Sequence, residues 1–79
     1  MRARFTAERA QSYDYADRMF AVGDTYNMTK GHQETIDTIW LDRKYGDCFH
    51  IEIVGKISGT DTTPGDFYRR VVSKQGEQA

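Results

Sequence analysis

The segment QETIDTIWLDRKYGDCFHIEIVGKI, residues 33–57, decides the fold of this chain. It holds two apolar stretches, 35–41 and 49–57, joined by the turn-like residues 44–47. Because successive side chains of a strand point to opposite faces, alternation of apolar and polar residues marks a half-buried strand. The second stretch alternates in this way, with Phe49, Ile51, Ile53 and Ile57 on one side and Cys48, His50, Glu52 and Lys56 on the other.

The first stretch fits two structures. Ile36, Ile39 and Trp40 recur at the spacing of a helix, and Gly46 would suit its end. Four β-branched residues and the tryptophan, however, fall within positions 35–40, and such residues favour sheets. Because a turn and a strand follow, the stretch predicts the first arm of a hairpin that spans 34–57.

The N-terminal part, residues 1–18, also leaves two alternatives. Its first positions alternate between polar residues and Met1, Ala3, Phe5 and Ala7, as in a strand. From Ala7 onward, helix formers and an apolar residue at every third position favour an amphipathic helix near 7–20. The period of two in the segment YDY, residues 13–15, favours a strand, which is the structure we expect.

The other segments are interpreted from their turn formers. Gly23 and Asp24 predict a bulge or bend, and residues 29–32 a loop. Residues 58–66 predict a further loop, in which Pro64 and Gly65 form a type II turn. Residues 67–72 are then predicted to be the last strand, and residues 73–79 a frayed tail.

Together these segments predict one small, mainly β domain over residues 1–79. Its form would be an antiparallel β-meander or half-barrel of four or five strands around the 34–57 hairpin; the alternative is an α+β domain with one N-terminal helix near 7–20. The predicted core consists of Phe5, Phe20, Val22, Ile39, Leu41, Phe49, Ile51, Ile53, Ile57 and Val71.

Composition excludes several classes of protein. Eleven basic and twelve acidic residues give a net charge of -1, which argues against a protein that mainly grips a nucleic-acid backbone. One cysteine permits no intrachain disulfide, which fits a reducing compartment. The N-terminal residues do not have the pattern of a secretory signal, and no apolar run approaches the ~20 residues that span a bilayer. We therefore expect a cytoplasmic protein that does not enter a membrane.

Metal and catalytic sites are not expected. Cys48, His50 and Glu52 would share one strand face, but the outer two would be about 13 Å apart, too far to share one zinc ion. A pair of Cys48 and His50 would lie next to the Glu52 carboxylate, which opposes formation of a thiolate. No phosphate loop, nucleophile elbow or metalloprotease motif occurs. The sequence therefore predicts a protein that is not an enzyme and carries no cofactor.

Two kinds of binding surface are suggested by charged and aromatic residues. A single-stranded nucleic-acid-binding β-barrel would use Arg2, Arg4, Arg69 and Arg70, brought together if the first and last strands pair. The bases of the bound nucleic acid would stack on aromatic residues such as Trp40, Tyr45 and Tyr68.

A protein-binding surface would instead use Tyr13, Asp14, Tyr15 and Asp17. Tyrosine is enriched where binding energy concentrates, and acidic groups can dock on a basic partner surface. We favour this protein-binding interpretation, because the net charge opposes the other.

In size, compactness, aromatic content and lack of a catalytic motif, the chain resembles the small accessory proteins of phages and mobile elements. These include anti-CRISPR and antirestriction inhibitors. The resemblance implies a non-enzymatic inhibitor that binds the surface of a host nucleic-acid-handling complex, and it assigns no functional residue. Because an unpaired edge strand invites association, either a monomer or a homodimer is expected.

Overall fold

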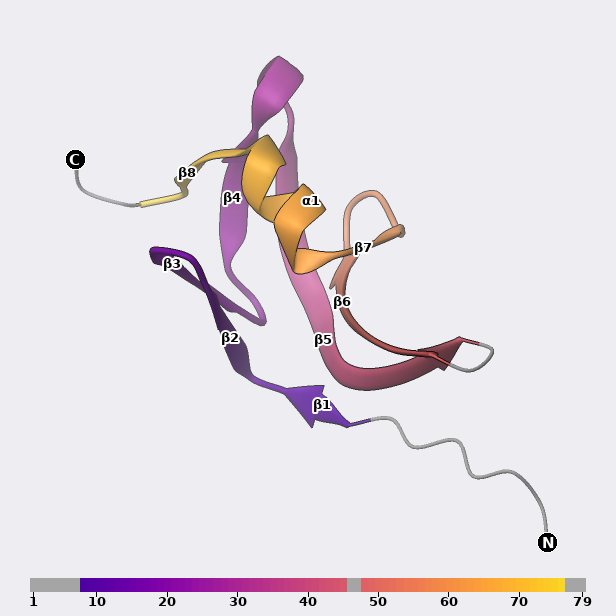
Figure 1. Cartoon of the computed structure of the whole chain (residues 1–79). Helices are drawn as coiled ribbons and strands as arrows, with labels where there is room; N and C mark the ends of the chain where they lie inside the picture. Colours follow the sequence, from indigo (N-terminus) through magenta and orange to yellow (C-terminus); the bar gives the residue numbers. More distant parts are fainter. Residues whose placement is uncertain (1–7, 46–47, 77–79) are drawn as a thin grey trace, which may run out of the picture.

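The computed structural model describes residues 8–45 and 48–76 and has a mainly β architecture (Figure 1). Its elements are β1 (Arg9–Ala10), β2 (Ser12–Tyr15), β3 (Arg18–Ala21), β4 (Thr25–Met28), the 3-10 turn η1 (Thr29–Gly31), β5 (Gln33–Tyr45), β6 (Cys48–Gly55), β7 (Asp61–Thr62), α1 (Pro64–Arg70) and β8 (Val71–Lys74). The predicted mainly β fold is confirmed. The alternative of a helix near 7–20 is wrong, because β1, β2 and β3 occupy that span.

The strands form one antiparallel sheet of six strands and a separate antiparallel ribbon made by β2 and β3. Five strands follow the order β7-β6-β5-β4-β8. The long strand β5 is central: β6 pairs along one edge, while β4 and β1 pair with different parts of β5. The predicted hairpin is present, with Ile39 directly opposite Ile53. The described residues thus form the expected antiparallel framework with additional short strands.

The core joins the sheet, the ribbon and the helix. Of the predicted core residues, Phe20, Ile39 and Ile53 are fully buried, and Val22 and Val71 pack at its margin. Leu41 and Ile51 are half-buried, whereas Phe5 lies outside the described residues and the side chain of Phe49 is not described. The core also contains four residues that the sequence pattern missed: Tyr26, Met28, Ile36 and Phe67.

The period of two in β6 predicts burial poorly near its end. Ile57 is 62% exposed, because the strand ends at Gly55 and a turn follows. Glu52, expected on the solvent face, is only 8% exposed. It lies opposite Trp40 in β5, which in turn lies opposite Arg9 in β1. These three side chains form a row across three strands on the face that the sequence assigned to solvent.

The segment predicted as the last strand is mostly helix. The hydroxyl of Thr63 accepts a hydrogen bond from the Asp66 backbone N–H, 3.1 Å away, and so caps α1. Pro64 occupies the first turn, where its fixed φ suits a helix and its missing N–H is no loss. Gly65 lacks the positive φ that the predicted type II turn requires. Residues 67–70 are therefore helical, and the strand β8 starts at Val71.

A buried carboxylate connects the two arms of the central hairpin. Glu34, 6% exposed in β5, accepts hydrogen bonds from the backbone N–H groups of Ile57 at 2.7 Å, Ser58 at 3.1 Å and Thr35 at 3.1 Å. It thereby fixes the turn that follows β6. Gly55 leaves space for this carboxylate, since a Cβ there would lie 2.5 Å from Oε1 and 2.7 Å from Oε2.

We expect Gly55→Ala to lower the free energy of unfolding by about 1–3 kcal/mol, because its methyl group would collide with the Glu34 carboxylate. Chemical denaturation measures this change. The double variant Gly55→Ala/Glu34→Ala removes the obstacle, so its two substitutions should destabilise by less than their sum. Additive effects would contradict this explanation.

We also expect Glu34 to make the stability depend on pH. Burial raises the pKa of this carboxyl, but hydrogen bonds from Ser58, Ile57 and Thr35 outweigh burial and hold the pKa below its usual value of 4.5. Ionised Glu34 therefore stabilises the folded chain above about pH 4.5, and this contribution is lost as the pH falls through the lowered pKa.

Glu34→Gln should destabilise the chain by about 1–3 kcal/mol at neutral pH, because an amide cannot accept all these N–H groups. The difference from the wild type should shrink as the pH falls below 4.5 and through the lowered pKa of Glu34. Chemical denaturation at a series of pH values measures it, with the exposed Asp37→Asn as the matched control. A difference that stays constant with pH would contradict the assignment.

Candidate protein-interaction surface

The ribbon of β2 and β3 ends in a tight turn that carries two of the predicted contact residues. Tyr15 pairs with Arg18, so Ala16 and Asp17 form the turn. Ala16 has a φ of 57°, in the left-handed region that residues other than glycine rarely adopt. Such a conformation persists only where the surroundings hold it, and it recurs at functional sites.

The helix α1 supplies the group that holds this turn. The Tyr68 hydroxyl donates a hydrogen bond to Asp17 Oδ1 at 2.5 Å. The rings of Tyr15 and Tyr68 lie with their centroids 5.5 Å apart and their planes tilted by 57°. The Tyr15 hydroxyl approaches α1 at Gly65, where a Cβ would come within 3.1 Å of it. Two tyrosine rings and one carboxylate thus meet at the surface.

The hydrogen bond couples the ionisation of its two partners. It lowers the pKa of the Asp17 carboxyl, because it stabilises the charged form. The same bond to Asp17 raises the pKa of the Tyr68 hydroxyl, because a tyrosinate would face the carboxylate without a proton between them. At neutral pH the site therefore holds an ionised aspartate beside a protonated tyrosine.

An open groove of about 530 Å³ runs beside these rings. Its charged rim residues are Asp66 and Arg69 of α1, which form an ion pair with each other. Its lining consists of Tyr15, Ala16, Thr63, Gly65, Asp66, Tyr68 and Arg69. We call the groove, together with the carboxylate of Asp17, the tyrosine groove.

The four residues predicted for protein binding do not form one patch. Tyr15 and Asp17 are exposed and adjoin the tyrosine groove. Tyr13 is half-buried and packs against the core, so its main role is structural. Asp14 is exposed, but its side chain points to the other face of the ribbon, because neighbours in a strand alternate. Tyr68, which the sequence analysis assigned to base stacking, lies beside Tyr15 where Tyr13 and Asp14 were expected.

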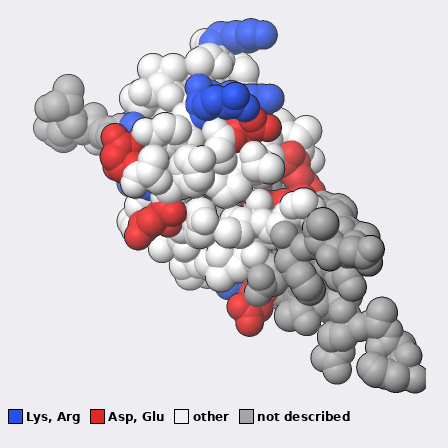
Figure 2. Space-filling model, in the orientation of Figure 1, with Lys and Arg blue, Asp and Glu red and all other residues white. Residues whose placement is uncertain are grey.

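The four arginines predicted for nucleic-acid binding are not shown to gather. Arg2 and Arg4 lie outside the described residues, and Arg69 is paired with Asp66. The last strand, β8, pairs with β4, and the first described strand, β1, pairs with β5. In Figure 2, blue basic atoms gather at the end that holds η1 and α1, with red acidic atoms directly beside them. This face therefore carries a mixed charge.

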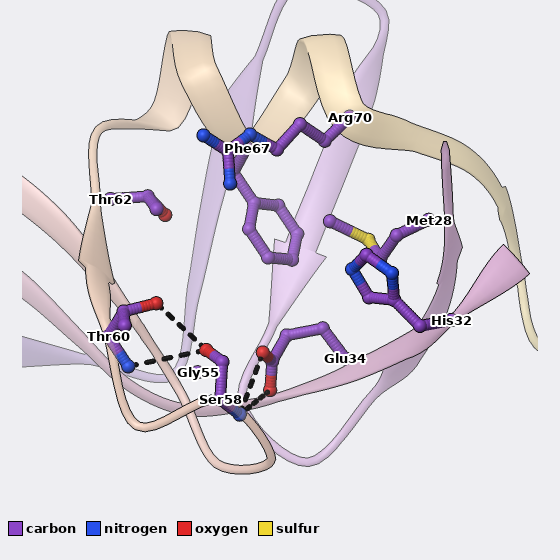
Figure 3. Close-up of a pocket in the computed structure, with 9 residues that line it drawn as sticks. All are labelled: Met28, His32, Glu34, Gly55, Ser58, Thr60, Thr62, Phe67 and Arg70. Carbon is purple, nitrogen blue, oxygen red and sulfur yellow. Dashed lines mark hydrogen bonds between the residues drawn. The ribbon is translucent and has the colours of Figure 1, made fainter. Parts of the chain in front are cut away.

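A second cavity, of about 70 Å³, lies between Glu34 and α1 (Figure 3). Its polar groups are largely engaged within the fold: backbone N–H groups bind Glu34, the Ser58 hydroxyl bonds that of Thr60, and the Thr62 hydroxyl donates to the Ile53 carbonyl. We assign this cavity a structural role in the turn after β6.

The remaining sequence candidates give no site in the described part of the chain. His50 is exposed on β6, while the side chain of Cys48 is not described. Within residues 8–45 and 48–76, no three His, Cys, Asp or Glu side chains are grouped closely enough to hold a metal ion. In the same residues, no helix has the length and apolar character that crossing a membrane requires.

We expect Asp17→Asn to lower the pKa of Tyr68 toward its usual value of 10.0, because a neutral amide holds the phenol proton less strongly. Tyr68→Phe should raise the pKa of Asp17 toward 3.8. Titration followed by NMR measures both values, and Asp37→Asn should change neither. Unchanged pKa values in both variants would contradict the hydrogen bond.

No protein-family model matches the chain, and no curated protein or solved structure is significantly similar to it.

Proposed function

We propose that this protein is a non-enzymatic interaction module that binds a protein partner through the tyrosine groove. The observation that supports this proposal is the meeting of Tyr15, Tyr68 and Asp17 at the surface, with ring centroids 5.5 Å apart and the Tyr68 hydroxyl 2.5 Å from Asp17. Tyr68 also packs on the core residue Phe20, with ring centroids 6.5 Å apart, and this contact helps to hold the group in place before binding.

Preorganised tyrosines suit protein recognition. A tyrosine ring presents a large area with few rotatable bonds, so that little conformational entropy is lost on binding. Here, the Tyr68 ring is further restrained by Asp17, and Tyr15 is 37% exposed, which leaves ring surface for a partner. Exposed aromatic surface beside a groove is typical of the residues that contribute most to an interface.

The class of partner that we propose is a protein surface of a nucleic-acid-handling complex in the host, which the bound chain would inhibit. The general character of a small aromatic-rich domain supports this class, as it does for the inhibitors of phages and mobile elements. The mixed charge around α1 favours a protein partner over direct binding of a nucleic-acid backbone (Figure 2).

Affinity capture from the lysate of the native host, with and without nuclease, tests this proposal. We expect one partner to remain after nuclease treatment. Tyr15→Ala/Asp17→Asn should weaken its binding by about tenfold or more, because a tyrosine hot spot and its charged neighbour are lost. Binding to the purified partner, measured by calorimetry, gives the factor.

The matched control is Asp37→Asn/Ile57→Ala, which removes one exposed carboxylate and one exposed apolar side chain elsewhere. It should bind like the wild type. Tyr13 stays unaltered in both variants, because its substitution would disturb the core. Undiminished binding by the folded Tyr15→Ala/Asp17→Asn variant would exclude the tyrosine groove as the contact.

A further inference from the structure

We infer that the tyrosine groove receives an arginine side chain of the partner protein. This inference rests on the proposed function and specifies the chemistry that the site recognises. Two aromatic faces and an adjacent carboxylate are the groups that bind a guanidinium, which stacks on a ring and donates hydrogen bonds in its own plane.

The geometry offers both kinds of contact. Tyr15 and Tyr68 contact each other, with their planes tilted by 57°, and Tyr15 is 37% exposed, so a planar group can stack on its outer face. The Asp17 carboxylate accepts hydrogen bonds from the Tyr68 hydroxyl and from its own backbone N–H, and a carboxylate, with about four lone-pair sites, can accept a further donor. The hydrogen bond to the ionised Asp17 also makes the Tyr68 ring richer in electrons, which strengthens its attraction for a cation.

The surrounding charges favour a cation over an anion. Asp17 is ionised at neutral pH beside the rings, and the rim charges of the groove, Asp66 and Arg69, offset each other as an ion pair. Arg18, at the other end of the same turn, also lowers the pKa of Asp17, and its positive charge offsets part of the charge of that carboxylate. The chain already uses the proposed contact elsewhere, since the Arg9 guanidinium lies 5.5 Å from the centre of the Trp40 ring. Arginine suits such a site better than lysine, because it stacks and is less strongly hydrated.

The test uses the full chain and short glycine-serine peptides that carry arginine, lysine, citrulline or glutamate at matched positions. We expect arginine peptides to shift the NMR signals of Tyr15, Tyr68 and Asp17 and to bind about two- to fivefold more tightly than citrulline peptides. Lysine peptides should bind more weakly than arginine peptides. Equal affinity for arginine and citrulline, or shifts confined to other residues, would overturn the inference.

Variants then assign the contact. Tyr15→Ala should remove the preference for arginine, and Tyr68→Phe, which keeps the ring but releases Asp17, should reduce it; Asp37→Asn should leave it unchanged. An oligonucleotide that shifts the same signals more strongly than the arginine peptide would overturn a protein segment as the ligand. Loss of the captured partner in Tyr15→Ala/Asp17→Asn without any preference for arginine would overturn this inference and leave the proposed function intact.

Discussion

Three aromatic rings hold the parts of this molecule together. Phe20 comes from the ribbon, Tyr26 from the sheet and Phe67 from the helix, and each meets the other two edge to face with centroids 5.1 to 5.6 Å apart. All three are at most 3% exposed. Aromatic pairs in this geometry contribute about 0.5–1.5 kcal/mol beyond the area that they bury. In a small domain with a thin margin of stability, such a cluster decides whether the parts stay together.

The cluster also determines where the surface residues lie. Tyr68 follows Phe67 on α1, and Tyr15 lies on the strand that pairs with β3, which carries Phe20. Once Phe20 and Phe67 are in contact, Tyr68 reaches Asp17 and the Tyr15 ring. The Tyr26 hydroxyl adds long hydrogen bonds to the β3 backbone, 3.4 Å from both the Ala21 nitrogen and the Met19 oxygen. The tyrosine groove is thus an outer extension of the core.

The cavity beside Glu34 and the tyrosine groove differ in the state of their polar groups. Near Glu34, backbone amides and neighbouring hydroxyls already bind the carboxylate and the alcohol side chains, so their hydrogen bonds stabilise a turn. At the tyrosine groove, one hydrogen bond orients Tyr68, and the aromatic faces stay accessible beside an ionised carboxylate. Most of the hydrogen bonds near Glu34 thus stabilise a turn, whereas the tyrosine groove leaves ring surface of Tyr15 exposed. This contrast supports the tyrosine groove as the site of interaction.

The hairpin could be predicted from residues 33–57 alone, because alternation and β-branching act within one strand and its neighbour. The start of α1 also has a local signal, because Thr63 precedes Pro64 and Asp66 comes three positions after the threonine. The turn and loop formers that fill residues 58–66 favour a loop there and mask this signal. Local preference therefore determines the strands and the start of the helix.

The site and the burial of its neighbours were decided by the tertiary structure. Tyr68 and Asp17 are 51 positions apart, and no local pattern relates them. Glu34 is buried although acidic residues are usually exposed, because the turn after β6 and the helix α1, both distant from it in sequence, lie around it. Tyr13 and Tyr15 are both tyrosines on the same face of β2. Tyr13 nevertheless packs on the core, whereas Tyr15 contacts Tyr68 of α1. Sequence determines which side chains can make contact, and the packing of the whole chain determines which of them do.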